Sequence, residues 1–415
     1  MRKKLFQTAT AVLALTMLLA APGCKKQETT ADVSPTITAE LTKEPEATPE
    51  PTAEPTKEPA AEPTKEPAAE PTKEPTAEPT IEPTGSVVQG EHVRVAEKLS
   101  EKDHATVVST TETLLASVAS IEGEEITAKP LFWKVTDPDG EGVLYLLGSF
   151  HITDSRSYQV HPEIKKAYEA SDAVALEFDL LPYVSIQSKA LEMYSAYVDT
   201  SLKTVDKVIG KELYEKAKAF LTEYNSYVAG LEYYKPYYWD SLMTNIVYQM
   251  AGIGDVIGYD LYFDSLAYRD GKTILEFESM EAQNELLLSA DNRMYINDIE
   301  SVLDEESRKE MIEEAGKLYE GWLSGDEEAL IELVNPDYSD PEFLALEEDF
   351  QENLKAYNKA MYEERNNGMA AGMKECIENG TVTLCIVGTA HFLGETGAVN
   401  QLKKAGYIVE QIVLE

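Results

Sequence analysis

Two segments of the chain end in the same pattern of glycine and histidine. The segments "VLYLLGSFHI" (143–152) and "TLCIVGTAHFLG" (383–394) each consist of an apolar run followed by Gly-x-x-His. The pairs are Gly148 with His151 and Gly388 with His391, and the whole chain has 5 histidines. Two neutral imidazoles over one crevice suit a divalent transition metal. The alternative is that each histidine only caps its own strand.

Carboxylates occur at the same kind of place. Glu177 lies among apolar neighbours in "VALEFDL", where a carboxylate is costly to bury unless it is paired or bound to metal. Its alternative is a position on a half-exposed strand. Glu276 and Glu278 lie in "ILEFES", and the solvent-facing alternative applies to Glu276 more than to Glu278. Glu177 and Glu278 are therefore the candidate acidic ligands or proton acceptors.

One arginine is a further candidate. Arg365, in "EERNNGMA", is predicted to lie on a helix that faces the last buried strand. From there a guanidinium could clamp a carboxylate or a transition-state oxyanion. The alternative is a surface ion pair with Glu363 or Glu364.

The elements that must position these residues follow from the apolar pattern. Continuous apolar runs are typical of strands buried on both faces. At the start of the globular part we expect strands over 131–136, 143–149 and 173–180, with a helix that begins with His161 and Pro162. At its end we expect helices over 357–380 and 397–407 and strands over 381–388 and 408–414. Between them the pattern is mostly helical, with one strand over 272–279.

These elements predict an α/β fold. Neither terminal β-α unit can bury its strands alone, so the two units must form one central sheet around the mostly helical middle region. In such sheets sites form outside the carboxyl ends of the strands, and both Gly-x-x-His motifs fall there.

The N-terminus has the features of an export signal. Residues 1–24 begin with a basic stretch, continue with an apolar core over 11–21 and end in "AAPGC". This ending resembles the lipobox of bacterial lipoproteins, although Ala21 stands where that motif prefers Leu. We therefore expect Cys24 to carry lipid and to anchor the chain at the extracellular face of the cell membrane. The alternatives are an ordinary secretory signal and an uncleaved anchor.

A low-complexity segment follows. Residues 25–90 contain the repeat "EPTKEPAAEPTKEP", whose prolines block helices and whose lack of apolar residues prevents a packed core. We expect an extended linker here, a peripheral lead-in over 91–124 and one globular domain over 125–415.

Composition excludes some classes of partner. The formal net charge is −39, most of it carried by residues 91–415, which argues against nucleic acid or anionic lipid as a partner. Of the 3 cysteines, Cys376 and Cys385 lie in apolar patterns and are expected to be buried thiols. His92 and His104 are expected to be exposed.

Five ordered blocks resemble the TraB/GumN family, which includes the Tiki proteins. The blocks are "FWKVTDPDGEGVLYLLGSFHI", "VALEFDL", "GYDLYFDSLAYRDGKTILEFESMEAQ", "ERNNGMAAGM" and "CIVGTAHFLGETGAVNQLKKAGYIVEQI". The resemblance spans about 131–413. The motifs of the family fall on both Gly-x-x-His pairs, Glu177, Gly258 with Asp260, Glu278 with Gln283, and Arg365 with Asn366.

The resemblance implies a metal site. Tiki members are described as metal-dependent proteases that favour manganese or cobalt, other members are linked to shutdown of peptide pheromones, and the fold is similar to that of erythromycin-esterase-like proteins. We therefore expect a divalent metal (manganese, cobalt or zinc) on His151 and His391. Glu177 or Glu278 would complete its ligands and the other would activate water, with Arg365 as a further catalytic candidate. The expected function is hydrolysis of peptides, and the alternative is a non-catalytic module that binds a peptide or small molecule.

The lipid anchor gives a first prediction. Substitution Cys24→Ala removes the only thiol that the signal offers for lipidation, so the variant should be released into the medium. The measurement is the fraction of the protein in the membrane pellet, compared with Cys376→Ala as a control. An unchanged membrane fraction in Cys24→Ala would contradict the anchor.

Overall fold

The computed structural model describes residues 90–121, 126–140, 142–254 and 256–415. The predicted signal, the lipidation site at Cys24 and nearly all of the predicted linker lie outside these residues. Within the described residues, no helix has both the length and the apolar composition needed to cross a membrane.

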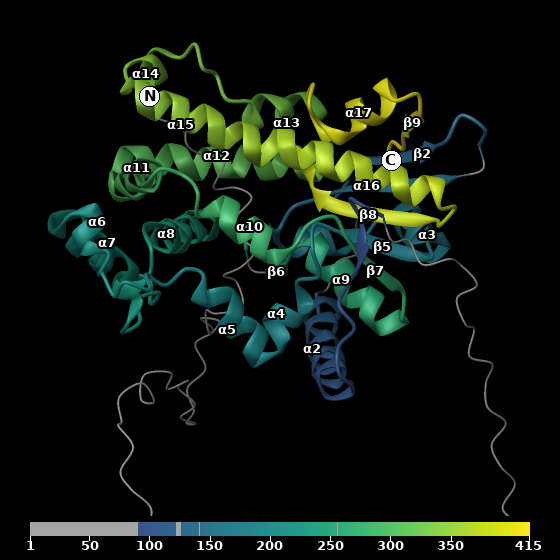
Figure 1. Cartoon of the computed structure of the whole chain (residues 1–415), viewed down its shortest axis with the longest axis horizontal. Coiled ribbons are helices and arrows are strands. Elements are labelled where there is room, and N and C mark those ends of the chain that lie inside the picture. The colour runs from purple at the N-terminus through teal and green to yellow at the C-terminus, as the bar shows by residue number, and fades with distance from the viewer. Residues whose placement is uncertain (1–89, 122–125, 141, 255) are drawn as a thin grey trace, which may run out of the picture. The chain divides into compact units, whose positions relative to one another are not determined.

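A seven-stranded sheet lies at the centre of the fold (Figure 1). Its order is β1-β7-β5-β8-β3-β2-β9. The strands are β1 (Arg94–Val95), β2 (Phe132–Thr136), β3 (Val143–Ser149), β5 (Ala173–Leu176), β7 (Thr273–Glu276), β8 (Thr383–Gly388) and β9 (Ile408–Gln411). Strands β7, β5, β8 and β3 are parallel, whereas β1, β2 and β9 pair antiparallel with their neighbours. The carboxyl ends of the four parallel strands therefore meet at one edge of the sheet.

The terminal units come together as predicted. Strand β3 pairs with β8 in parallel from Leu144 opposite Thr383 to Ser149 opposite Gly388, and β2 pairs with β9. Every residue of β8 is buried, in agreement with its continuous apolar sequence. These pairings confirm the α/β fold class.

The strands that carry the candidate carboxylates are shorter than predicted. Strand β5 ends at Leu176 and β7 ends at Glu276. Glu177 and Glu278 consequently lie in the loops just beyond the strands. Two short strands that were not predicted, β4 (Ile152–Thr153) and β6 (Val256–Ile257), form a second sheet next to His151.

Helices cover both faces of the sheet. In Figure 1, α16 (Arg365–Glu378) lies above strand β8 and α9 (Tyr259–Asp270) lies below the strands. Helix α17 (Ala398–Lys404) packs beside α16, and α3 (Pro162–Ala170) begins where Pro162 predicts. The Nδ1 of His161 accepts a hydrogen bond from the backbone N–H of Glu163, so this histidine is a helix cap.

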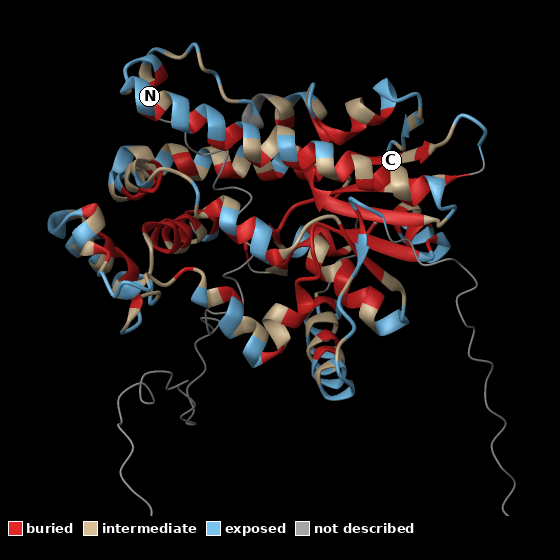
Figure 2. Cartoon of the chain, viewed as in Figure 1, coloured by how far each residue is buried: buried red, intermediate tan, exposed pale blue. Residues whose placement is uncertain are grey.

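The middle of the chain forms a helical layer with its own hydrophobic core. Its helices are α4 (Leu181–Ser185), α5 (Gln187–Ser195), α6 (Asp206–Ile209), α7 (Lys211–Glu223), α8 (Pro236–Met250), α10 (Met280–Leu287), α11 (Asn292–Leu303), α12 (Glu305–Ser324), α13 (Glu327–Val334), α14 (Pro341–Leu344) and α15 (Glu348–Asn358). Figure 2 shows the central strands of the sheet buried, whereas the edge strands β1 and β9 are largely exposed. Among these helices, α8 is buried over most of its surface. Both cysteines in the described residues are buried free thiols, as expected.

The helix predicted over 357–380 differs in its bounds. Helix α15 leads into a π-helical segment, η4 (Lys359–Glu364), which leads into α16. The wider turn of a π-helix changes which side chains face the sheet in the following helix. Arg365, the first residue of α16, is buried.

The lead-in belongs to the same packed structure. Strand β1 pairs with β7 at the edge of the sheet, and α2 (Glu101–Ala119) packs against α9. Ser100 caps α2 by accepting a hydrogen bond from the backbone N–H of Asp103. His92 and His104 are exposed, as expected.

One carboxyl group lies in the helical core without a cation. Asp240 of α8 is 1% exposed, and its Oδ1 accepts a hydrogen bond from the Thr244 hydroxyl at 3.4 Å. Burial raises the pKa of Asp240 from 3.8 to about 8. Because the folded chain then binds this proton more tightly than the unfolded chain, Asp240 destabilises the fold increasingly as the pH rises from 3.8 toward 8.

The second prediction follows from the loss of stability that Asp240 causes as the pH rises. Asp240→Asn should be more stable than the wild type by about 1–3 kcal/mol at pH 8, because an amide has no charge to bury. The advantage should shrink as the pH falls to 5. The measurement is urea unfolding of both proteins at the two pH values, with the exposed Glu348→Gln as a control for charge loss. An advantage that does not change with pH would contradict this account.

Candidate functional site

The candidate residues gather at the carboxyl ends of the four parallel strands. His151 follows β3, Glu177 follows β5, and Glu278 follows β7. Gly388 ends β8, and His391 lies in the short 3-10 helix η5 (Thr389–Phe392) that comes next. Parallel pairing thus places side chains from both ends of the domain along one edge of the sheet.

A second oxygen-bearing side chain orients each histidine. The Nδ1 of His151 lies 3.0 Å from Oδ2 of Asp260, and the Nδ1 of His391 lies 2.7 Å from Oδ1 of Asn366. Because carboxylate and amide oxygens only accept hydrogen bonds, the proton of each imidazole belongs on Nδ1. Nε2 is then the nitrogen of each ring that is free for other chemistry.

Both rings and one carboxylate surround Gly388. A Cβ atom at Gly388 would lie 3.3 Å from His151 Nε2, 3.3 Å from Glu177 Oε1 and 3.6 Å from His391 Cδ2. His391 Nε2 lies 3.7 Å from Glu177 Oε1. The absent side chain of this glycine therefore leaves a small space between three groups that can each donate a lone pair.

A second glycine, Gly258, lets the backbone of His151 lie close to the start of α9. A Cβ atom at Gly258 would lie 2.3 Å from the backbone oxygen of His151. Any larger residue would push apart the loop that bears His151 and the start of α9, which bears Asp260. Gly258 and Asp260 therefore act together in holding the ring of His151.

Glu177 is held from both sides. Its Oε1 accepts a hydrogen bond from the backbone N–H of Gly388 at 2.9 Å. Its Oε2 accepts hydrogen bonds from Arg365 Nη2 at 2.7 Å and Gln283 Nε2 at 3.1 Å. Burial acts to raise the pKa of Glu177, but Arg365 and the two histidines outweigh it and lower the pKa to about 2. Glu177 is therefore a fixed anion.

Arg365 lies between Glu177 and Glu278. Its Nε donates to both carboxylate oxygens of Glu278, at 2.9 and 3.0 Å, while Nη2 donates to Glu177. Arg365 is buried, so the surface ion pair with Glu363 or Glu364 is wrong; Glu364 pairs with Lys359 instead. The π-helical segment before Arg365 contributes to this inward orientation.

The two carboxyl groups titrate differently. Burial and the nearby charge of Glu177 raise the pKa of Glu278, against the opposite effect of Arg365. The pKa of Glu177 is lowered, so one group stays ionised while the other takes up a proton more readily. Two carboxyl groups with pKa values moved in opposite directions are typical of an acid–base site.

The pKa values of the two histidines are moved in opposite directions. Burial and Arg365 lower the pKa of His391 to about 3, so its ring is neutral. For His151, burial acts to lower the pKa, but Asp260 outweighs it and the pKa is raised. The Nε2 of His391 is buried and has no hydrogen-bond partner in the described structure, which leaves its lone pair directed into the site.

The donor set fits a metal ion in type. An imidazole whose Nδ1–H is held by an oxygen and whose Nε2 is free has the arrangement found at metal ligands. The unpartnered Nε2 of His391 and the space at Gly388 agree with this use. As the side chains stand, no three His, Cys, Asp or Glu side chains among the described residues lie close enough together to hold one ion.

Three partners in the site were not assigned a role from the sequence. Asp260, Asn366 and Gln283 contact His151, His391 and Glu177, respectively. Each lies far from its partner in the chain, so spacing alone gives no signal. Their only indication was that each occurs in a block that resembles the family.

The third prediction concerns the pairing of Arg365 with the carboxyl groups of Glu177 and Glu278. Arg365→Met leaves two buried carboxyl groups without their cation, so chelator-treated protein should lose about 3–5 kcal/mol of unfolding free energy. Adding Glu278→Gln should recover part of the loss. The surface control Lys359→Met should change stability by less than about 1 kcal/mol. Equal effects of Arg365→Met and Lys359→Met in urea unfolding at pH 7 would show that the buried pairs do not stabilise the fold.

Comparison with known protein families supports the family resemblance of the sequence. Residues 131–411 match the model of the TraB/PrgY/gumN family. No curated protein and no solved structure matched the chain. The match covers both Gly-x-x-His motifs, the two carboxylates and Arg365, which shows that this chain belongs to the TraB/PrgY/gumN family.

Proposed function

We propose that this protein is a metal-dependent hydrolase that cleaves peptides and is held at the outer face of the membrane by lipid on Cys24. The single observation that carries the proposal is the buried Nε2 of His391, which lacks a hydrogen-bond partner and lies 3.7 Å from Glu177 Oε1. A buried lone pair without a donor is costly unless it is used.

The chain supplies a specific set of ligands. His151 and His391 would hold the ion through Nε2, and Glu177 would hold it through Oε1, while Asp260 and Asn366 keep the rings in place. Imidazole and carboxylate together suit manganese, cobalt and zinc. Such an ion, when bound, polarises a carbonyl and lowers the pKa of water.

Glu278 would move the proton, and Arg365 would keep Glu177 ionised. Glu278, whose pKa burial raises, can accept a proton from the attacking water and return it to the leaving amine. The peptide bond is then replaced by a carboxylate and an amine, and Glu278 regains its starting state. Arg365 keeps Glu177 ionised through the reaction, because its Nη2 donates to that carboxylate.

The fourth prediction tests the proposed activity. Chelator-treated full-length protein in detergent should regain metal, measured by elemental mass spectrometry, and should cleave members of a peptide library when manganese, cobalt or zinc is added. His151→Ala and His391→Ala should each abolish both properties, and the double variant should be no worse, because the two residues act as a unit. The matched controls are the exposed His92→Ala and His104→Ala, which should behave as the wild type.

Two outcomes would contradict the proposal. Cleavage that survives in both site variants would show that hydrolysis comes from elsewhere. Metal binding that depends on both histidines, without cleavage of any library member, would favour the non-catalytic binding module instead.

A further inference from the structure

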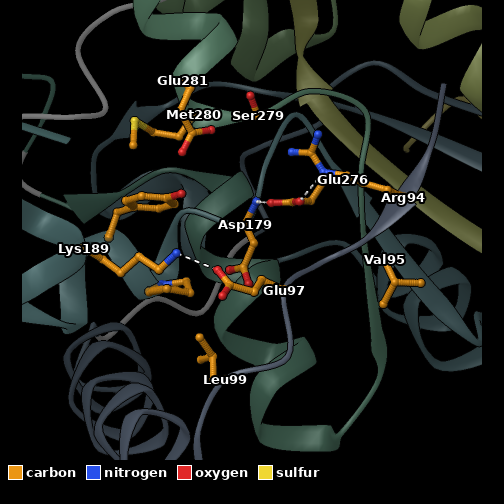
Figure 3. A pocket seen from close by; sticks show the side chains of 12 residues that line it. Arg94, Val95, Glu97, Leu99, Asp179, Lys189, Glu276, Ser279, Met280 and Glu281 are labelled. Atoms are coloured by element: carbon orange, nitrogen blue, oxygen red, sulfur yellow. Dashed lines mark hydrogen bonds and ion pairs between the residues drawn. The ribbon is translucent and has the colours of Figure 1, made fainter. Parts of the chain in front are cut away.

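A pocket of about 480 Å³ lies beside the candidate site at the same edge of the sheet. Its walls come from β1 and the segment that joins β1 to α2, the loop after β5, helices α4 and α5, the end of β7 with the loop that follows it, and the start of α10. Its volume is in the range of small-molecule sites, about 300–1,000 Å³. Figure 3 shows Asp179, Glu276, Glu97 and Lys189 around this pocket.

Acidic side chains outnumber basic ones in the walls of the pocket. The acidic residues are Glu97, Asp179, Glu276 and Glu281, and the basic ones are Arg94 and Lys189. Each basic group is already paired: Arg94 Nε with Glu276 Oε2 at 2.9 Å, and Lys189 Nζ with Glu97 Oε2 at 2.6 Å. No described basic side chain pairs with either of the remaining acids, Asp179 and Glu281.

Asp179 is the most deeply buried of the four acids, because only 4% of it is exposed. Its Oδ2 accepts a hydrogen bond from the Tyr268 hydroxyl at 2.6 Å. A side-chain hydrogen bond joins Asp179 to the neighbouring, fully buried carboxyl of Asp264, so the two groups share one proton and keep a negative charge between them. A buried carboxylate without a cation is costly, so a positive charge placed in the pocket would offset that cost.

The rest of the wall suits an aliphatic stem. Leu99, Pro182 and Met280 line the pocket, and Pro182 and Met280 are buried. These three apolar side chains, set among carboxylates, can contact the methylene chain of a side chain whose terminal cation is neutralised by the acids.

We propose that this pocket binds a positively charged amino-acid side chain, lysine or arginine, of a peptide. Asp179 lies two residues after Glu177, and Glu276 lies two residues before Glu278. A peptide that places a basic side chain in the pocket would therefore run past the candidate site. This extension to the choice of substrate rests on the proposed hydrolase function, whereas the binding itself does not.

The test uses three blocked amino acids as probes on the full-length, metal-free protein. They are N-acetyl-lysine methylamide, its norleucine analogue, which lacks the amine, and its glutamate analogue. Titration calorimetry in about 0.15 M salt, which screens weak binding to the acidic surface, should show the lysine probe binding at least about tenfold more tightly than the norleucine probe.

Variants locate the binding. Asp179→Asn and Glu281→Gln should each weaken the lysine probe severalfold and leave the norleucine probe unchanged, while the surface control Glu348→Gln should have no effect. Glu281 is exposed, so its variant gives a result even where Asp179→Asn fails to fold. Equal affinity for lysine and norleucine, tighter binding of glutamate, or lysine binding that neither variant weakens would overturn the proposal.

The variant His391→Ala separates this proposal from the proposed function. It should keep its affinity for the lysine probe while it loses metal and cleavage. Loss of cleavage without loss of probe binding supports the pocket whatever the reaction. Cleavage without any preference for lysine or arginine in the library overturns the extension to the choice of substrate and leaves the proposed function standing.

Discussion

The parallel pairing of β3 with β8 is the constraint on which the rest of the structure depends. Strand β8 is buried at every position, and β3 is buried over its second half. Neither strand can remain exposed to water, and each completes its hydrogen bonds only beside the other. Their register sets Ser149 opposite Gly388, which brings the loops that bear His151 and His391 to the same edge.

The charges at this edge form one connected arrangement. Arg365 pairs with two carboxylates that would otherwise repel each other in a buried environment, and burial together with this guanidinium lowers the pKa of His391. Removing the cation from between the two buried anions would leave both charges uncompensated. The chain's own side chains therefore hold these charges in place, whereas no three His, Cys, Asp or Glu side chains among the described residues lie close enough together to hold an ion.

The lead-in, residues 91–124, contacts the loop that carries Glu278. Arg94 pairs with Glu276 and donates to the backbone oxygen of Glu278, so a segment outside the family match touches the loop that carries a candidate proton acceptor. The same segment forms one wall of the pocket. The sequence of this segment gave no such indication, because its contacts are to residues that are distant in the chain.

The sequence predicted the central strands, the convergence of the terminal units and the position of the candidate residues at one edge of the sheet, because apolar runs and glycines reflect local constraints. It did not predict the short strands β1, β4 and β6. It placed Glu177 and Glu278 inside strands, whereas β5 and β7 end before them. The partners of Arg365 were not predictable, since a buried ion pair and an exposed one have the same local sequence. Asp260 and Asn366 were not assigned for the same reason, because each orients a ring that belongs to another element.

The central claim is that His151 and His391 bind one metal ion together. X-ray absorption spectroscopy of the cobalt-loaded protein measures this most directly, because it counts the imidazole ligands and gives their distance. The account predicts two imidazole nitrogens at about 2.1 Å in the wild type and loss of the bound cobalt in His151→Ala and in His391→Ala. A shell of oxygen atoms alone, unchanged in these variants, would show that cobalt binds the acidic surface and would contradict the account.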